Sequence, residues 1–316
     1  MGSHTESLSM PASISPVLPC LAHSPRSSRR LRSLRSLRRL GIALSVGLAL
    51  IVPSHSLWAR EGVEVGGNSK FSKLVPASQV EQAAQQQYGQ LLQEASSKQA
   101  LASADNAQVK RLRAIAQKII PFSYEWNPRA KDWKWEVNLI GSDQINAFCM
   151  PGGKIAFYSG ILDKLKLTDD EVAMVMGHEV AHALREHARE RMGKQAATGI
   201  GANVLSQVLG LGTLGQQAIG MGAQLMSLKF GREDESEADL VGMELAARAG
   251  YNPKAGISLW QKMAAANKGA PPQWLSTHPS GTTRISDIEK NLPKVEPLYN
   301  KAKPGDKAVV KPTPAP

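Results

Sequence analysis

Residues 168–192 constrain the fold more than any other part of this chain. Thr168 and Glu171 have the spacing of a capping box, which predicts the start of a helix. Residues 172–184 are apolar on nearly every face of that helix, except at the sequence GHEVAH. Because such a helix must be buried, the sequence predicts that two histidines and a glutamate lie inside the protein.

The polar residues of this helix are spaced for metal binding. His178 and His182 are four residues apart, about 40° around the helix axis, so their rings project side by side and can ligate one Zn²⁺. Glu179 lies on the adjacent edge, where it can take a proton from water activated by a metal. The alternative is a chance match, which would leave these three side chains buried without partners at a cost of several kcal/mol.

A zinc site of this kind needs a third protein ligand. The extended metzincin motif requires Gly at position 185 and His at position 188, whereas this chain has Arg185 and Ala188. His187 is expected to be a solvated residue at the charged end of the helix.

A second predicted helix, at residues 234–249, offers a better candidate. Glu235 and Asp239 are four residues apart on it, so Glu235 can bind the metal while Asp239 accepts the second ring N–H of a ligating histidine. A charged helix start is also typical of a solvated N-terminus, which is the expectation for Glu233, Asp234 and Glu237. Spacing alone leaves both interpretations of Glu235 open.

The rest of the core is predicted to contain further helices and a small sheet. Helices are expected at residues 79–98 and 106–120, the second stopped by Pro121. Short β-rich runs follow at residues 133–141, 145–150 and 154–159. Cys149 lies in an apolar run and is expected to be a buried, inert thiol. The fold class is therefore predicted to be α+β, mainly helical.

Residues 195–228 contain seven glycines and no charged side chain. A buried helical pair packed through glycines is the favoured interpretation. A lid or membrane-contacting loop near the cleft is an alternative, and a spanning helix is disfavoured by the Gln, Asn, Ser and Thr content.

The first 59 residues are expected to be a signal peptide with an N-terminal extension. A basic stretch at residues 26–39 precedes an apolar run at 41–52 and then small residues, the layout of a secretory signal. The run is short of the ~20 residues that span a bilayer; an uncleaved anchor is the alternative. Export to a bacterial periplasm follows. This segment carries +6 of the net charge of +11. More than half of the excess positive charge would therefore be removed with it, and the charge of the remainder does not support nucleic-acid binding.

Five motifs occur in order between about residues 105 and 292: NAFCMPGGKIAFYSGIL, HEVAH, ESEAD, AARAGYNP and THPSGTTRI. Together they resemble the zinc metallopeptidase family of the CaaX prenyl proteases and HtpX, and within it the soluble periplasmic BepA/LoiP-type branch. The resemblance implies a gluzincin-type metalloprotease domain with a small β-sheet beside the HExxH helix and one Zn²⁺ per chain. It implies that His178, His182 and Glu235 are the metal ligands and that Asp239 orients His178.

The resemblance also implies roles outside the two metal-binding helices. His278 would stabilise the oxyanion of the tetrahedral intermediate, and Arg284 would support the cleft. The alternative for His278 is to occupy the open metal position of a latent state. We expect substrate to pair in extended form with an edge strand at Asn146, Ala147 and Phe148.

The expected function is zinc-dependent cleavage of peptide bonds in misfolded or stalled envelope and outer-membrane proteins, with the outer-membrane assembly machinery as a partner. Processing of prenylated proteins is not expected, because the spanning helices of the membrane-embedded relatives are not found, although peripheral membrane contact stays open. The alternative is a non-proteolytic periplasmic chaperone or scaffold, which would not need Glu179. The expected organisation is a helical segment at 60–104, the metallopeptidase domain at 105–292 and a Lys/Pro-rich disordered tail at 293–316.

Overall fold

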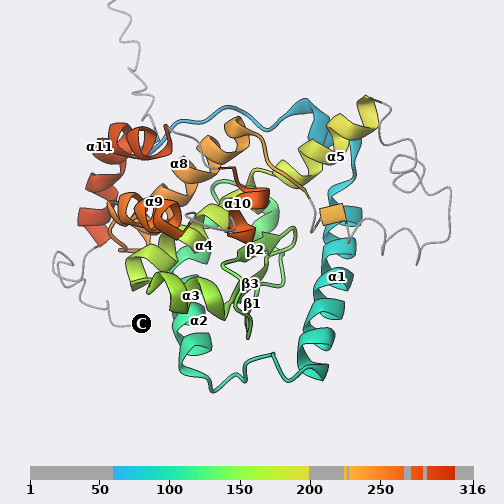
Figure 1. The fold of residues 1–316 in the computed structure, drawn as a ribbon. Coiled ribbons are helices and arrows are strands. Elements are labelled where there is room, and N and C mark those ends of the chain that lie inside the picture. Colours follow the sequence, from blue (N-terminus) through green and yellow to red (C-terminus); the bar gives the residue numbers. More distant parts are fainter. Residues whose placement is uncertain (1–59, 199–223, 226–227, 267–271, 280–282, 303–316) are drawn as a thin grey trace, which may run out of the picture. The chain divides into compact units, whose positions relative to one another are not determined.

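The computed structural model describes residues 60–198, 224–225, 228–266, 272–279 and 283–302, all within one compact unit (Figure 1). The segment expected to be a signal peptide and most of the uncharged segment at 195–228 lie outside the described residues. Within the described residues, no helix is both long and apolar enough to cross a membrane.

The described part is mainly helical around one three-stranded sheet. The strands are β1 (Glu136–Ile140), β2 (Ala147–Met150) and β3 (Lys154–Tyr158). The helices before and around them are η1 (Lys70–Leu74), α1 (Ala77–Ser97), α2 (Ala107–Ser123), η2 (Pro128–Lys131), α3 (Ser159–Leu165) and α4 (Asp169–Leu184). Those that follow are α5 (His187–Ala197), α8 (Arg232–Arg248), α9 (Ala255–Ala266), α10 (Gln273–Thr277) and α11 (Arg284–Ala302).

The sheet has the order β1-β3-β2, with β1 parallel and β2 antiparallel to the central strand. Ile155 and Phe157 of β3 face the core formed with α2 and α4, whereas Ala156 and Tyr158 pack in the cluster formed with α1. Figure 1 shows the sheet between these helices. Because helices cover both faces, every residue of β3 is buried, and β2 remains at the edge.

Helix α4 is the buried centre of the fold. Thr168 accepts a hydrogen bond from the backbone N–H of Glu171, and the Glu171 carboxylate accepts one from the backbone N–H of Thr168, so the predicted capping box is present. The helix packs against α8 through Gly177 and Gly242. A Cβ added at Gly242 would lie 2.5 Å from the His178 backbone nitrogen, and one added at Gly177 would lie 2.5 Å from the Gly242 carbonyl oxygen. Only glycine allows two helices to approach this closely.

Two helix ends differ from expectation. Pro121 lies inside α2, which continues to Ser123, because a proline so near the end removes only one helical hydrogen bond. Helix α11 continues through Pro293 and Pro297 to Ala302, ten residues into the expected tail, since its Val295 and Leu298 are buried in the core. Residues 303–316 lie outside the described residues.

The single helix expected at residues 168–192 is broken. Helix α4 ends at Leu184, Glu186 adopts a left-handed conformation with φ +58°, and α5 begins at His187. The Asn127 side chain donates a hydrogen bond of 3.0 Å to the Leu184 carbonyl oxygen at the end of α4. A tertiary contact therefore helps to satisfy the helix end that the local sequence did not signal.

We expect Gly242→Ala to destabilise the protein by about 1–3 kcal/mol, because the added methyl group would force α4 and α8 apart. Metal retention should fall with it, since the two helices carry the polar cluster described below. The matched control is Gly89→Ala on α1, where a Cβ meets nothing within 4 Å; this change should stabilise slightly through helix propensity. Denaturant unfolding of both variants tests the prediction, and equal stability of Gly242→Ala and the parent would contradict it.

Candidate active site

Four buried side chains converge at the crossing of α4 and α8. His178, His182, Glu235 and His278 each offer one donor atom, and these atoms all lie within 4.8 Å of one another. The two α4 histidines are one turn apart, Glu235 is in the first turn of α8, and His278 directly follows α10. The structure thus brings together three residues expected at the metal and the loop histidine expected beside it.

The two α4 rings face each other through Nε2, at 3.1 Å. On its other side, His178 Nδ1 lies 3.0 Å from Asp239 Oδ1, as expected for an orienting carboxylate. Burial lowers the pKa of His178 to about 4, against the opposing effect of Asp239, and burial also holds the pKa of His182 well below its ordinary value. Both rings are therefore neutral near pH 7, the state in which imidazole binds a metal.

Arg284 connects the carboxylates of α8. Its guanidinium donates to both oxygens of Asp239 at 2.6 Å and to Glu235 Oε2 at 2.5 Å. Burial opposes ionisation of Asp239, but the charge of Arg284 lowers the pKa of Asp239 to about 2. Burial raises the pKa of Glu235 to about 8 despite the same arginine. A further cation is what would fully stabilise Glu235 as a carboxylate.

Glu179 points to the same centre from α4. Its Oε1 accepts a 2.5 Å hydrogen bond from Trp274 Nε1, and its carboxylate also accepts one from the backbone N–H of Cys149. Burial raises the pKa of Glu179 well above its usual range, against the effect of Trp274. A raised pKa suits a group that must accept a proton and later donate it.

The orphaned atoms of the cluster fit a divalent metal. Glu235 Oε1 and His278 Nε2 are buried without a hydrogen-bond partner, and the two facing Nε2 atoms of His178 and His182 can share at most one proton between neutral rings. Two imidazole nitrogens and a carboxylate oxygen are a donor set that binds Zn²⁺ and related ions. Leaving them unpaired would cost free energy that a cation recovers.

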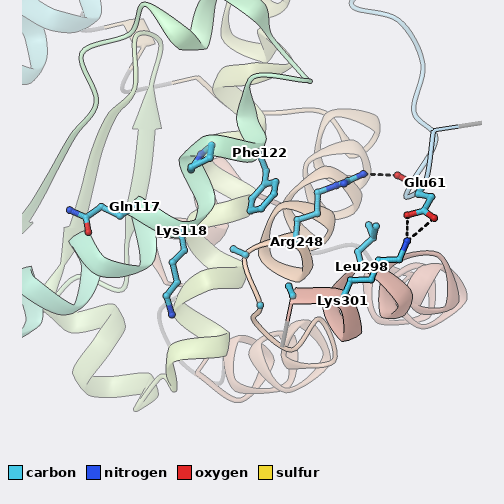
Figure 2. A pocket seen from close by; sticks show the side chains of 11 residues that line it. Glu61, Gln117, Lys118, Phe122, Arg248, Leu298 and Lys301 are labelled. Carbon is cyan, nitrogen blue, oxygen red and sulfur yellow. Dashed lines mark hydrogen bonds and ion pairs between the residues drawn. The ribbon is translucent and has the colours of Figure 1, made fainter. Parts of the chain in front are cut away.

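A cavity of about 290 Å³ opens beside these donors. Glu179, His182 and His278 line one part of it. Another part is lined by the residues expected to bind substrate: Asn146, which directly precedes β2, and Ala147 and Phe148 of that strand. A larger cavity, of about 610 Å³, lies at the ends of α2, α8 and α11 (Figure 2). Its Arg248 and Lys301 are already bonded to Glu61, and none of the four donors lines it.

Several polar residues that the sequence predicted to be solvated lie in buried or bonded positions. His187, expected to be solvated, is 1% exposed and lies 2.9 Å, Nδ1 to Nδ1, from His182. Glu237 is half-buried and binds His187 and Arg185. Asp234 is buried and accepts a hydrogen bond from the Gly231 backbone N–H. The break at residue 186 accounts for the positions of His187 and Glu237, and Asp234 caps the start of α8. Cys149 is buried, as expected.

Two aromatic residues of the site were missed. Trp274 stacks on His278 with ring centroids 4.9 Å apart, besides bonding Glu179. Phe230 stacks on His182 at 3.9 Å. The only sequence signal available was a tryptophan four residues before His278, and it has no meaning without the fold.

These features define the site of an HExxH metallopeptidase, and comparisons with known proteins agree. The sequence pattern of peptidase family M48 matches residues 78–292. The mitochondrial metalloendopeptidase OMA1 of Arabidopsis thaliana is 39% identical over 150 residues, which cover 48% of this chain and 30% of the relative. The metalloprotease LoiP of Escherichia coli is 30% identical over 207 residues, which cover 64% of this chain and 78% of LoiP. The beta-barrel assembly-enhancing protease of Yersinia pestis is 30% identical over 171 residues, covering 50% of this chain and 35% of that protein.

This chain belongs to peptidase family M48. It spans half or less of the length of the OMA1 proteins from Arabidopsis thaliana, Saccharomyces cerevisiae and Schizosaccharomyces pombe. Family membership and the donor set together support a divalent metal at the α4–α8 crossing.

We expect purified protein to hold about one metal ion per chain, and Glu235→Ala to lose most of it, because two imidazoles alone bind a divalent metal weakly. Glu235→Gln keeps an acceptor for Arg284 and so separates loss of a ligand from loss of folding. The control is Glu233→Ala, an exposed change in the same helical turn, which should retain the metal. Elemental analysis identifies the metal and measures the metal content of the parent and of the three variants. Full metal retention in both Glu235 variants would rule out Glu235 as a ligand.

Proposed function

We propose that this protein is a zinc endopeptidase of the bacterial envelope, with His178, His182 and Glu235 as ligands and Glu179 as general base. The observation that carries the proposal is the position of Glu179. Its Oε2 lies 3.7 Å from Nε2 of His278 in the four-donor cluster, and it lines the same cavity as the edge strand β2. A non-proteolytic chaperone or scaffold would need the cavity to bind unfolded proteins, but it would not need the buried carboxylate of Glu179 beside the donor cluster.

When bound, the zinc ion would lower the pKa of a water molecule and polarise the substrate carbonyl. Glu179 takes the proton from the attacking water and returns it to the leaving amine. Asp239 holds the ring of His178, and Arg284 keeps Asp239 ionised and Glu235 in place. These residues fix the positions of the polar groups before substrate binds. Such preorganisation is the main source of rate acceleration in many enzyme sites.

The edge strand supports an extended substrate. The Asn146 carbonyl, directly before β2, accepts a hydrogen bond from the Tyr158 backbone N–H. Backbone groups alternate in direction along an antiparallel strand, so those of Ala147 and Cys149 point away from β3. The Ala147 N–H is bonded only locally, to Asn146 Oδ1 at 3.0 Å. A substrate strand can therefore pair at Ala147, beside the cavity, with Phe148 on the other face of the strand.

The envelope assignment rests on two observations. Residues 1–59 have the pattern of a secretory signal, and one relative is named for β-barrel assembly. We therefore propose a periplasmic location, with misfolded or stalled outer-membrane proteins as substrates and their assembly machinery as a partner. Peripheral membrane contact belongs to the same proposal.

Glu179→Gln tests the chemistry. It keeps the size of the side chain and an acceptor for Trp274 but removes the base, so cleavage of an unfolded β-barrel protein should fall by about 10²–10⁴-fold. Zinc content, measured in parallel, should not change, and a chelator should abolish parental cleavage. Near-parental cleavage by Glu179→Gln would refute the mechanism. A parent that holds zinc and prevents aggregation of the substrate, yet cleaves nothing, would support the chaperone alternative.

His278 has a separate test. We propose that it donates a hydrogen bond to the oxyanion, so His278→Ala should lower kcat by about 10²–10³-fold with little change in KM. Its Nε2 is unpartnered and His278 belongs to the four-donor cluster, which also fits a latent state with His278 at the open metal position; in that case His278→Ala would raise basal cleavage. Ser276→Ala, an exposed change in the same segment, is the control. Unchanged kinetics of a short peptide with His278→Ala would exclude both roles.

A further inference from the structure

The chain reverses direction directly after the metal-binding helix, and the reversal costs free energy. Glu186 has φ +58°, a left-handed conformation that is unfavourable for a non-glycine residue. Glu186 is ion-paired with Arg189, and Asn68 donates to its carboxylate at 3.5 Å. As a result His187, the next residue, turns back onto His182, with ring centroids 5.0 Å apart.

His187 connects His182 to a charged pair. Its Nδ1 lies 2.9 Å from His182 Nδ1, and its Nε2 lies 2.9 Å from Glu237 Oε2. Arg185 Nε donates to the other carboxylate oxygen of Glu237 at 2.8 Å, and Arg185 Nη2 is ion-paired with that oxygen at 2.6 Å. Both imidazoles are almost completely buried, so water does not provide these hydrogen bonds.

The hydrogen bonds from His182 through His187 to Glu237 form a series, and the chemistry of these three side chains fixes where its protons lie. His182 Nε2 faces Glu235 Oε1 at 3.3 Å and must be unprotonated to bind a metal. The proton of the neutral ring is then on Nδ1, which donates to His187 Nδ1. His187 must in turn carry its proton on Nε2, which donates to Glu237.

Glu237 is suited to be the last acceptor. One of its oxygens is ion-paired with the Arg185 guanidinium, and the other lies 2.9 Å from His187 Nε2. A carboxylate only accepts hydrogen bonds. Glu237 therefore fixes His187 as its donor, and His187 in turn must accept from His182.

We propose that His187 and Glu237 are positioning residues that fix the ring orientation and tautomer of His182 and thereby tighten metal binding. The inference rests on the proposed role of His182 as a metal ligand. His178 receives a carboxylate directly, from Asp239, whereas His182 receives one through an intervening imidazole. Partners of ligating histidines typically contribute about 10- to 100-fold in metal affinity.

The variants at position 187 separate hydrogen bonding from packing. His187→Leu removes both contacts and should weaken zinc binding by about 10- to 100-fold. His187→Gln offers an oxygen that can accept from His182 and an amide N–H that can donate to Glu237, so it should restore affinity to near the parental value. Glu237→Ala should weaken binding as well, and the double variant His187→Leu/Glu237→Ala should be no weaker than His187→Leu alone, because the two residues act in series.

Competition with a zinc chelator measures these affinities, and Glu233→Gln, an exposed change in α8, serves as the control. Affinity of folded His187→Leu within twofold of the parent would overturn the proposal. Equal weakening by Gln and Leu would also overturn it, because the effect would then come from ring packing.

A second measurement needs no variant. Side-chain ¹⁵N spectra of the histidines in the zinc-loaded wild-type protein should show His187 protonated at Nε2 and unprotonated at Nδ1; the reverse assignment would overturn the proposal. The proposed function fails separately, in the cleavage assay with Glu179→Gln, whose zinc affinity should equal that of the parent. The zinc-affinity test of the positioning residues and the cleavage test of the proposed function can therefore fail independently of each other.

Discussion

The close approach of α4 and α8 is the contact on which the rest of the site depends. Two glycines, Gly177 and Gly242, let the backbones approach so closely that a Cβ on either would meet the opposite backbone at 2.5 Å. Gly177 directly precedes His178, so the closest point of the crossing is also the start of the metal motif. With larger residues there, the side chains of Glu235 and Asp239 would be held away from the α4 histidines.

The parts of this arrangement that depend on local sequence could be predicted. The capping box at Thr168, the two histidines one turn apart and a strand within residues 145–150 all follow from periodicity and short-range chemistry. The choice of Glu235 needed more than spacing, because an acidic helix start is common for unrelated reasons. Its proximity to both α4 histidines depends on the crossing, and family resemblance supplied that information.

The parts that were missed depend on tertiary contacts. A non-glycine residue with φ +58° at Glu186 has no sequence signal, and without that break His187 would project about 140° away from His182. The continuation of α11 through two prolines likewise follows from the burial of Val295 and Leu298. Trp274 contacts Glu179 across 95 positions of sequence, a distance at which no local pattern operates.

The charges of the site explain why so much of its machinery is on α8. Glu235, Glu237 and Asp239 are within five residues of one another on that helix, and each carboxylate has its own partner on α4 or at the break that follows it. Two arginines compensate them, Arg185 at Glu237 and Arg284 at the other two. Burying an unpaired carboxylate is costly, so the arginines let three acids lie close together beneath neutral rings. Helix α4 therefore supplies nitrogen donors, and α8 supplies the negative charge that orients those donors and attracts a cation.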